Sequence, residues 1–162
     1  MIVVSDTSPL NYLVLLDVAH VLPALFGEVI VPPAILVELT RAETPDPVRQ
    51  WALQPPVWLR LQAPDSIVAG LDLDQGETEA ISIAVALKAD LLLIDDRKGR
   101  RAANLHGLTT IGTLTVLESA AKQELVSFPT AMEKLRSTNF RASRAMLDEA
   151  LKRDLDRRQR RS

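Results

Sequence analysis

The chain has 162 residues, of which 47% are hydrophobic and 25% charged, with a formal net charge of -2 at pH 7 and no cysteine. This length suits one domain of ordinary size, and the composition is typical of a globular protein and not of a disordered one. The lack of cysteine excludes a disulfide framework, a thiolate metal site and a cysteine nucleophile.

No segment has the pattern of a membrane helix or an export signal. The longest clean apolar runs cover residues 80–87 and 91–94, which is far short of the roughly 20 residues that a membrane helix needs. The first residues have neither the positive start nor the cleavage signature of a signal peptide. We therefore expect a cytoplasmic protein.

Charge is distributed unevenly along the chain. Residues 134–162 hold ten Lys or Arg and four Asp or Glu, a net of +6, whereas residues 1–133 hold nine and seventeen, a net of -8. An acidic body with a basic tail is common in proteins that bind a polyanion beside a carboxylate metal site. A solvated helix with exposed arginines explains the basic segment equally well, and we expect residues 157–161 to form a frayed tail.

Short strands and helices alternate in the first part of the chain. After an apolar strand, Ser8 can cap a helix and Pro9 suits its first turn. Proline is likewise tolerated at the start of a helix behind Pro32 and Pro33. The predicted elements are a strand over 2–4, helices over 9–16 and 18–25, a strand over 29–31, helices over 34–40 and 48–53, and a strand over 57–61.

The alternation continues after a loop over 62–74. Asp74 and Glu77 have the spacing of a capping box for the helix behind them. The wholly apolar segment 91–94 has the pattern of a parallel strand covered on both faces. A helix over 97–106, a strand near 109–111 and a helical pattern from residue 114 onward follow. The alternation predicts an α/β domain with a mainly parallel sheet.

Carboxylates follow the predicted strands, at the edge of the sheet where α/β proteins bind ligands. Several such acids in one place repel one another unless a divalent cation compensates their charge or their pKa values rise. Mg²⁺ or Mn²⁺ suits oxygen ligands, and such sites commonly activate water to attack a phosphodiester. The acids concerned are Asp6, Glu38, Glu77, Glu79, Asp95 and Asp96.

Each of these acids also has an ordinary structural explanation. Asp6 can start a turn, and Glu77 can complete the capping box with Asp74. Glu79 can favour the helix dipole, and one of Asp95 and Asp96 can cap the next helix. Only their expected location at the ends of neighbouring strands favours a shared site.

Other catalytic chemistry has little support in the sequence. His20 and His106 are far apart and lack a companion motif, which argues against a paired-histidine ribonuclease or a Ser-His-Asp hydrolase. The six glycines form no phosphate-binding fingerprint. A different Mg²⁺-dependent phosphoryl-transfer enzyme is also poorly supported, because position 8 is Ser and an Asp-x-Asp start is absent.

Four segments together resemble the PIN domain, and in particular its small stand-alone prokaryotic branch (DUF3368-like), which is similar to VapC-type toxins. The resemblance spans nearly the whole chain and continues into the residues around Gly112. The segments are Ser-Asp-Thr-Ser-Pro-Leu-Asn at 5–11, Val-Glu-Leu at 37–39, Asp-Gln-Gly-Glu-Thr-Glu-Ala-Ile at 74–81 and Leu-Ile-Asp-Asp-Arg-Lys-Gly-Arg at 93–100.

The resemblance implies a three-layer α/β/α sandwich and a Mg²⁺- or Mn²⁺-dependent endoribonuclease, often the toxin of a toxin-antitoxin pair. Carried over by position, it implies that Asp6 is the first metal carboxylate and that Glu38 helps to orient water or metal. The third acid would be Glu77 or Glu79, and the fourth Asp96 or Asp95. Our interpretation takes Asp6, Glu77 and Asp96 as the metal ligands and Thr7, Ser8, Asn11, Arg97 and Lys98 as substrate-binding residues.

The sequence departs from the commoner toxin pattern at the third and fourth acidic positions. The choice between Glu77 and Glu79 and the choice between Asp95 and Asp96 therefore stay open. An alternative is a non-catalytic PIN-fold module that binds RNA or protein. If the toxin interpretation holds, we expect an antitoxin that covers the acidic cleft and a homodimer formed by the early helices. We expect residues 1–140 to form the nuclease domain and 141–162 a basic helix and tail of the same domain.

Overall fold

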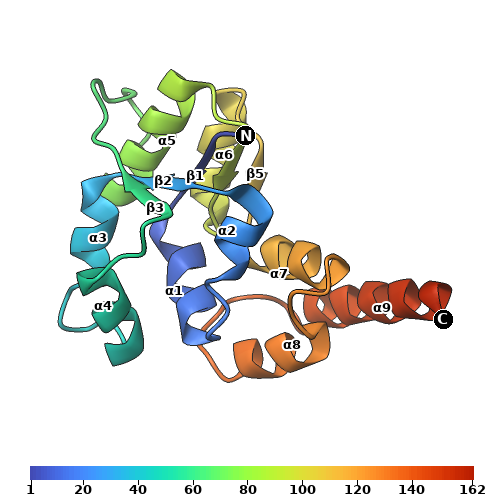
Figure 1. Cartoon of the computed structure of the whole chain (residues 1–162). Coiled ribbons are helices and arrows are strands. Elements are labelled where there is room, and N and C mark those ends of the chain that lie inside the picture. Colours follow the sequence, from blue (N-terminus) through green and yellow to red (C-terminus); the bar gives the residue numbers. More distant parts are fainter. The chain divides into compact units, whose positions relative to one another are not determined.

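Five short strands form one parallel sheet in a computed structural model that describes residues 1–162 (Figure 1). The chain divides into two compact units, Met1–Thr113 and Leu114–Ser162, which are described separately. The sequence-based division at residue 140 stays a prediction. No helix is long and apolar enough to cross a membrane.

The first unit contains the sheet and six helices, in the alternating order that the sequence predicts. The elements are β1 (Val3–Ser5), α1 (Thr7–Leu15), α2 (Val21–Phe26), β2 (Val29–Val31), α3 (Pro33–Leu39), α4 (Asp46–Leu53), β3 (Leu59–Leu61), α5 (Gln75–Leu87), β4 (Leu91–Leu93), α6 (Arg97–Leu105) and β5 (Thr110–Ile111).

The strand order is β3-β2-β1-β4-β5, and every neighbouring pair is parallel. The chain therefore leaves β1 toward β2 on one side and returns as β4 on the other. This reversal creates a crevice at the carboxyl ends of β1 and β4, where open α/β sheets bind ligands. The predicted α/β fold with a parallel sheet is confirmed.

Packing on one face of the sheet follows from the strand register. Val4 pairs with both Ile30 and Leu92, so these three side chains share a face, since side chains alternate along a strand. They form a buried cluster with Ile81 of α5 and Ala103 of α6. This face of the sheet is therefore covered by α5 and α6 (Figure 1).

The start of α1 differs from the sequence prediction. The helix begins at Thr7, and Asp6 occupies the N-cap position without making a side-chain cap hydrogen bond. The prediction of Ser8 as the cap was wrong, and Pro9 lies in the third helical position. Asp6 is thus held directly between β1 and α1, while its carboxylate is not used by the helix.

The second unit is helical. It contains α7 (Thr113–Lys122, with its first residue in the first unit), α8 (Phe128–Arg136) and α9 (Arg144–Arg161). Helix α9 continues through Arg161, so the predicted frayed tail was wrong. Buried Asp154 accepts hydrogen bonds from Arg157 and Arg158, and Arg161 pairs with Glu124, which holds the last helical turns.

Candidate active site

Asp6 lies at the carboxyl end of the central strand β1. Its backbone N–H donates to the carbonyl of Leu93 over 2.8 Å, which extends the pairing of β1 with β4 by one residue. The side chain is buried, with 4% of the residue exposed. The fold therefore places this acid in the crevice formed where the strand order reverses.

Glu38 is brought beside the start of α1 from helix α3. Its Oε2 accepts a hydrogen bond of 2.7 Å from the Thr7 hydroxyl. A Cβ at position 76 would lie 3.0 Å from the same oxygen and from Ile35 Cδ1, closer than side chains ordinarily pack. Glycine at position 76 thus lets the Glu38 carboxylate lie against the first turn of α5.

The N-terminus of α5 adds two more acids. Asp74 is the N-cap, and its Oδ1 accepts a hydrogen bond of 2.8 Å from the Glu77 N–H. The Asp74 backbone N–H in turn acts on the Glu77 carboxylate as a hydrogen-bond donor and lowers its pKa. The two residues therefore have the reciprocal arrangement of the predicted capping box.

Asp6 lies in an environment that opposes its ionisation. Burial raises the pKa of its carboxyl well above the usual value, and a hydrogen bond from the Thr7 backbone N–H lowers it in part. The negative charges of three further carboxylates raise this pKa still more, those of Glu77, Asp74 and Glu38.

Glu77 lies in a similar environment. Burial raises its pKa from 4.5 to about 7, with further contributions from the negative charges of Asp74, Asp96 and Glu38, while a hydrogen bond from the Asp74 backbone N–H to the carboxylate lowers it. Every side-chain charge that shifts Asp6 or Glu77 is negative. The charges that act on these two carboxyls therefore include no compensating cation, and both pKa values are raised.

These mutual effects define an acidic cluster at one end of the sheet. Its members follow β1 and β4 or lie on α3 and at the start of α5. They are Asp6, Glu38, Asp74, Glu77 and Asp96. The sequence pattern indicates only a capping role for Asp74, and its position one turn before Glu77 is the signal that also places it near the site.

Asp95 and Asp96 have different surroundings. Both Asp95 oxygens accept from Thr113, at 2.7 Å from the backbone N–H and 2.7 Å from the hydroxyl. Burial raises the pKa of Asp95, although these hydrogen bonds and Arg100 lower it. Asp96 caps α6 through Gly99 N–H at 2.8 Å. The structure thus brings Asp96 toward Glu77 and fastens Asp95 to the start of α7.

Glu79 does not contribute to the shifted pKa of Asp6 or Glu77. Its Oε1 accepts a hydrogen bond of 3.2 Å from Gln75 Nε2 on the preceding turn. It lines a groove of about 450 Å³ that also contacts Glu38 and Asp74. Residues two apart on a helix project about 200° from each other, which explains why Glu77 and Glu79 have different surroundings.

The predicted substrate-binding residues are distributed over α1 and α6. Thr7 holds Glu38, as described above, and Ser8 and Asn11 are half-buried on α1. Arg97 and Lys98 are exposed on the first turn of α6, where Lys98 pairs with Asp72 over 3.1 Å. An exposed ion pair of this kind contributes little stability, so Lys98 can exchange Asp72 for another anion.

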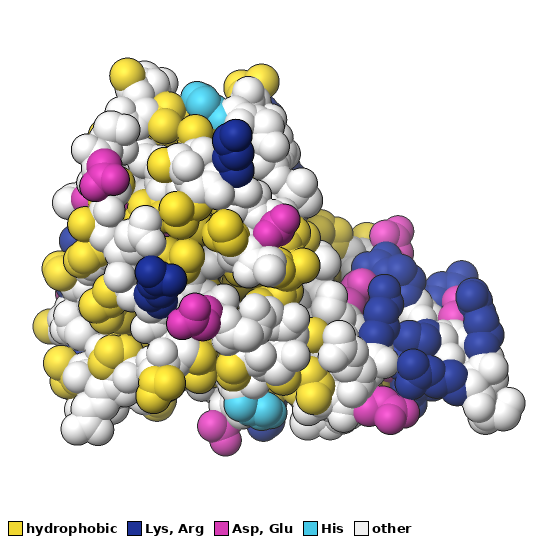
Figure 2. All heavy atoms as spheres, turned by 45° about the horizontal axis from the view of Figure 1, so that its top comes forward, with side chains coloured by type: hydrophobic (Ala, Val, Ile, Leu, Met, Phe, Trp, Pro, Cys, Tyr) yellow, Lys and Arg dark blue, Asp and Glu magenta, His cyan; other side chains and the backbone are white.

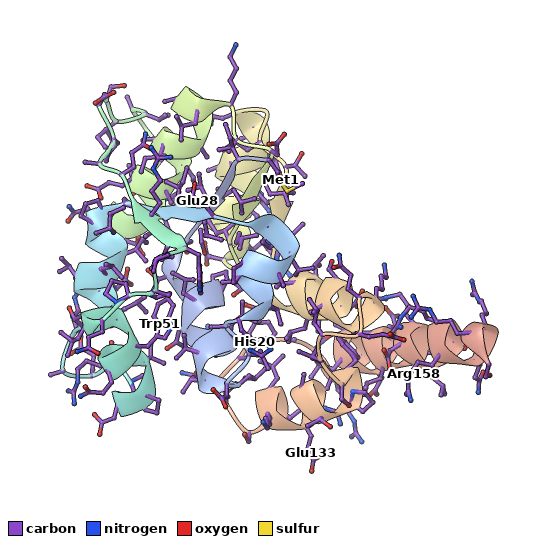
Figure 3. All side chains as sticks on the ribbon, viewed as in Figure 1. Met1, His20, Glu28, Trp51, Glu133 and Arg158 are labelled. Atoms are coloured by element: carbon purple, nitrogen blue, oxygen red, sulfur yellow. The ribbon has the colours of Figure 1, made fainter.

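Neither histidine belongs to the acidic cluster. His20 lies immediately before α2 and makes no cap hydrogen bond (Figure 3). His106, after α6, contacts the carbonyl of Ala102 at 2.9 Å through Nδ1. Imidazole catalysis therefore finds no support at this site.

The donor set of the acidic cluster fits a hard divalent cation. All five side chains offer carboxylate oxygen, which Mg²⁺ and Mn²⁺ prefer, and burial together with neighbouring negative charges raises the pKa values of two of them. No three acidic or histidine side chains already form a finished metal site. Binding an ion would thus require the longer side chains to move inward.

The shifted pKa of Glu77 predicts how stability depends on pH in metal-free protein. The unfolded chain releases this proton near 4.5 and the folded protein near 7, so the free energy of unfolding falls as the pH rises through that window. Allowing for half exposure, the loss attributable to Glu77 is about 1–2 kcal/mol. Urea unfolding at pH 5 and pH 8 measures this loss. In Glu77→Gln the free energy of unfolding should differ less between the two pH values. An equal difference in both proteins would contradict the assignment of the raised pKa to Glu77.

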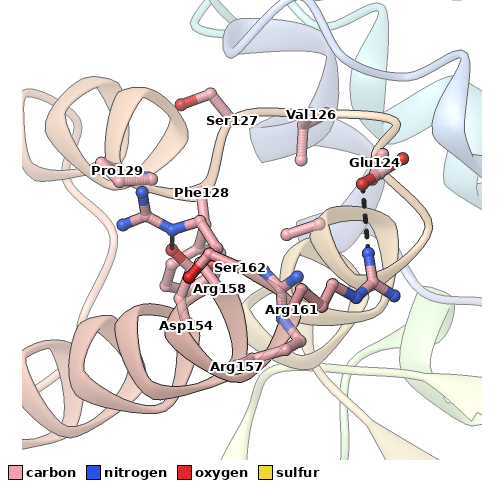
Figure 4. A pocket seen from close by; sticks show the side chains of 11 residues that line it. Glu124, Val126, Ser127, Phe128, Pro129, Asp154, Arg157, Arg158, Arg161 and Ser162 are labelled. Carbon is pink, nitrogen blue, oxygen red and sulfur yellow. Dashed lines mark hydrogen bonds and ion pairs between the residues drawn. The ribbon is translucent and has the colours of Figure 1, made fainter.

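A larger cavity, of about 600 Å³, lies in the second unit (Figure 4). Its arginines are paired with acids, Arg158 with Asp154 and Arg161 with Glu124. Figure 2 shows Lys and Arg side chains gathered over α9. This cavity is a basic feature of the helical unit and has no carboxylate cluster comparable to that of the first unit.

The five-stranded parallel sheet with acids at its carboxyl edge defines an α/β protein of the PIN type. The chain belongs to the family DUF3368, described as "PIN domain", whose family model matches residues 2–155. PIN domains are typically nucleases, so family membership is consistent with an acidic active site at this edge. The resemblance drawn from the four sequence segments is confirmed.

A solved structure supports the fold independently. The chain is similar to a PilT N-terminus domain protein, SSO1118, from the hyperthermophilic archaeon Sulfolobus solfataricus P2, with a TM-score of 0.53 and 21% sequence identity. The match covers 74% of this chain and 93% of that one. No curated protein matches the chain.

Proposed function

We propose that this protein is a metal-dependent endoribonuclease that hydrolyses phosphodiester bonds in RNA. The observation that carries the proposal is the acidic cluster, in which the pKa values of buried Asp6 and half-buried Glu77 are raised by burial and by neighbouring carboxylates, with no cation among the charges that act on them. Such a cluster is costly in a folded protein unless a cation joins it. Membership of a family that typically comprises nucleases supports the same chemistry.

We assign the metal ligands to Asp6, Glu77 and Asp96, which come from three different elements of one sheet edge. Mg²⁺ or Mn²⁺, when bound, would supply a polarised water and positive charge toward the phosphate. Thr7 holds the Glu38 carboxylate by a hydrogen bond of 2.7 Å, and this carboxylate would orient the attacking water and accept its proton. Arg97 and Lys98 would hold the RNA backbone, since contacts to phosphate mainly position a nucleic acid.

The experiment is cleavage of a mixed RNA pool by purified protein with Mg²⁺, with Mn²⁺ or with EDTA. We expect endonucleolytic products with either metal and none with EDTA, because the carboxylates alone cannot supply the missing positive charge. Intact RNA with both metals, from folded protein free of any partner, would overturn the proposal. Cleavage that persists in EDTA would overturn the metal requirement.

One observation favours a second candidate, a PIN-fold module that binds RNA or protein without catalysis. No three side chains form a finished metal site, which is also what a binding module would show. The two candidates differ in the thermal response to Mg²⁺. A nuclease is stabilised by the ion because it binds the folded state, whereas a module without a metal site is not.

We further propose that the protein acts as the toxin of a toxin-antitoxin pair, with a cognate antitoxin that covers the acidic cluster and a homodimeric form. The support is the VapC-like sequence pattern described above. Induced expression is expected to arrest growth of a host cell, and co-expression of the adjacent gene product to relieve the arrest. Light scattering of the purified protein tests the dimer.

A further inference from the structure

A groove beside the acidic cluster has the properties of a base-binding site. It has a volume of about 450 Å³ and lies between α3, the segment after β3 and the start of α5. We call it the Glu79 groove. Two of its lining residues, Glu38 and Asp74, are members of the acidic cluster, so a group bound in the groove lies next to the proposed cleavage site.

One wall of the groove is apolar and accessible. It is lined by Pro33, Val37 and Pro64, and Val37 is 61% exposed although it is a large aliphatic side chain. Exposed apolar surface within a concave site commonly marks a binding surface. Proline rings and a branched aliphatic side chain offer the kind of apolar contact that the face of a nucleobase can use.

The other wall is polar and mainly negative. Glu79 holds Gln75 by a hydrogen bond of 3.2 Å, and Arg41 is the single cation among the lining residues. The lining of the groove thus includes three carboxylates, from Glu38, Asp74 and Glu79, and one guanidinium. This balance disfavours a phosphate in the groove and favours an uncharged group that donates hydrogen bonds.

We propose that the Glu79 groove binds a nucleobase with an exocyclic amino group, next to the scissile phosphate, and that Glu79 determines this preference. Cytosine, adenine and guanine carry such an amino group, whereas uracil does not, and a carboxylate can accept from it. The inference rests on the proposed function for the identity of the substrate. It gives Glu79 a role in specificity and separates it from the metal ligands.

The test measures binding in EDTA, so that it does not depend on cleavage. A labelled uridine hexanucleotide is compared with hexanucleotides in which one central uridine is replaced by cytidine or adenosine, using fluorescence anisotropy. We expect the amino-bearing base to lower the Kd roughly tenfold, the scale of a good base contact. In Glu79→Gln this preference should fall to about one, because an amide can both donate and accept.

The matched control is Glu28→Gln, the same chemical change at an exposed glutamate that precedes β2, outside the groove (Figure 3). This variant should keep the tenfold preference. Equal binding of all hexanucleotides to the wild-type protein, no binding up to millimolar concentration, or an unchanged preference in Glu79→Gln would each overturn the proposal.

Failure of the groove proposal can be told apart from failure of the nuclease proposal. Metal-dependent cleavage together with equal binding of all bases would reject the proposal for the groove and support the proposal of a nuclease. Base preference in EDTA without cleavage in either metal would keep the groove and remove the nuclease.

Discussion

Asp6→Asn is expected to abolish metal-dependent RNA cleavage while making the metal-free protein more stable. The substitution keeps the shape of the side chain and removes a proposed metal ligand, so the cleavage rate should fall by about 10³-fold or more. It also removes a buried group whose pKa is raised by burial and by neighbouring negative charges. Initial rates on an RNA substrate and thermal melting in EDTA measure the two effects.

The gain in stability should grow with pH. Below the ordinary pKa of aspartate, 3.8, both folded and unfolded wild-type chains hold the proton, and the two proteins should differ little. At higher pH the unfolded wild-type chain releases this proton first, which lowers wild-type stability and not that of Asp6→Asn. Helix α1 should lose little, because Asp6 makes no side-chain cap hydrogen bond and the asparagine oxygen can still accept from the Thr7 N–H.

Asp17→Asn is a suitable control for this experiment. Asp17 is exposed after α1 and has a positive φ of 58°, a conformation that asparagine tolerates well. The Asp17→Asn variant should retain cleavage and the rise in melting temperature caused by Mg²⁺, both of which Asp6→Asn should lose. Full activity of Asp6→Asn would contradict its assignment as a metal ligand.

Asp95→Ala is expected to destabilise the first unit by about 2–4 kcal/mol, the second large effect. The variant removes both hydrogen bonds to Thr113, whose N–H and hydroxyl are buried and would be left without an acceptor. Urea unfolding monitored by circular dichroism measures the loss.

Asp95→Asn separates this structural role from a catalytic one. Its amide oxygen can still accept from the Thr113 N–H, and its amide nitrogen can donate to the hydroxyl, so most of the stability should return. Cleavage and stabilisation by Mg²⁺ should return with it. A folded Asp95→Asn protein without activity would show instead that the Asp95 charge takes part in the reaction.

Much of the fold could be predicted from the pattern of apolar residues. The run at 91–94 lacks polar alternation because its successive side chains point to opposite faces of the sheet and Leu92, Leu93 and Ile94 are all buried. The alternation of strands and helices predicted the parallel sheet. The start of α1 could not be predicted, since Ser8 and Asp6 are both good caps by composition. The pairing of Asp6 N–H with Leu93, a contact distant in sequence, decides where β1 ends.

The location of the site could be predicted, but the roles within it could not. The choices between Glu77 and Glu79 and between Asp95 and Asp96 depend on which way each side chain projects. Thr113, 18 residues after Asp95, holds that carboxylate, and no local pattern around residue 95 signals this contact. For Asp74 the local pattern is recognisable but incomplete: it predicts the helix cap and does not reveal that the same carboxylate also contributes charge to the cluster.

The strand order has a consequence for folding during synthesis on the ribosome. Asp6 is made first, but its neighbours across the sheet, β4 and the start of α6, follow some 90 residues later. Parallel pairings between such distant segments form slowly, since the intervening chain must be closed into a loop first. The complete acidic cluster therefore cannot form until the first 97 or so residues are free to fold, so any activity that depends on the whole cluster is absent from shorter nascent chains.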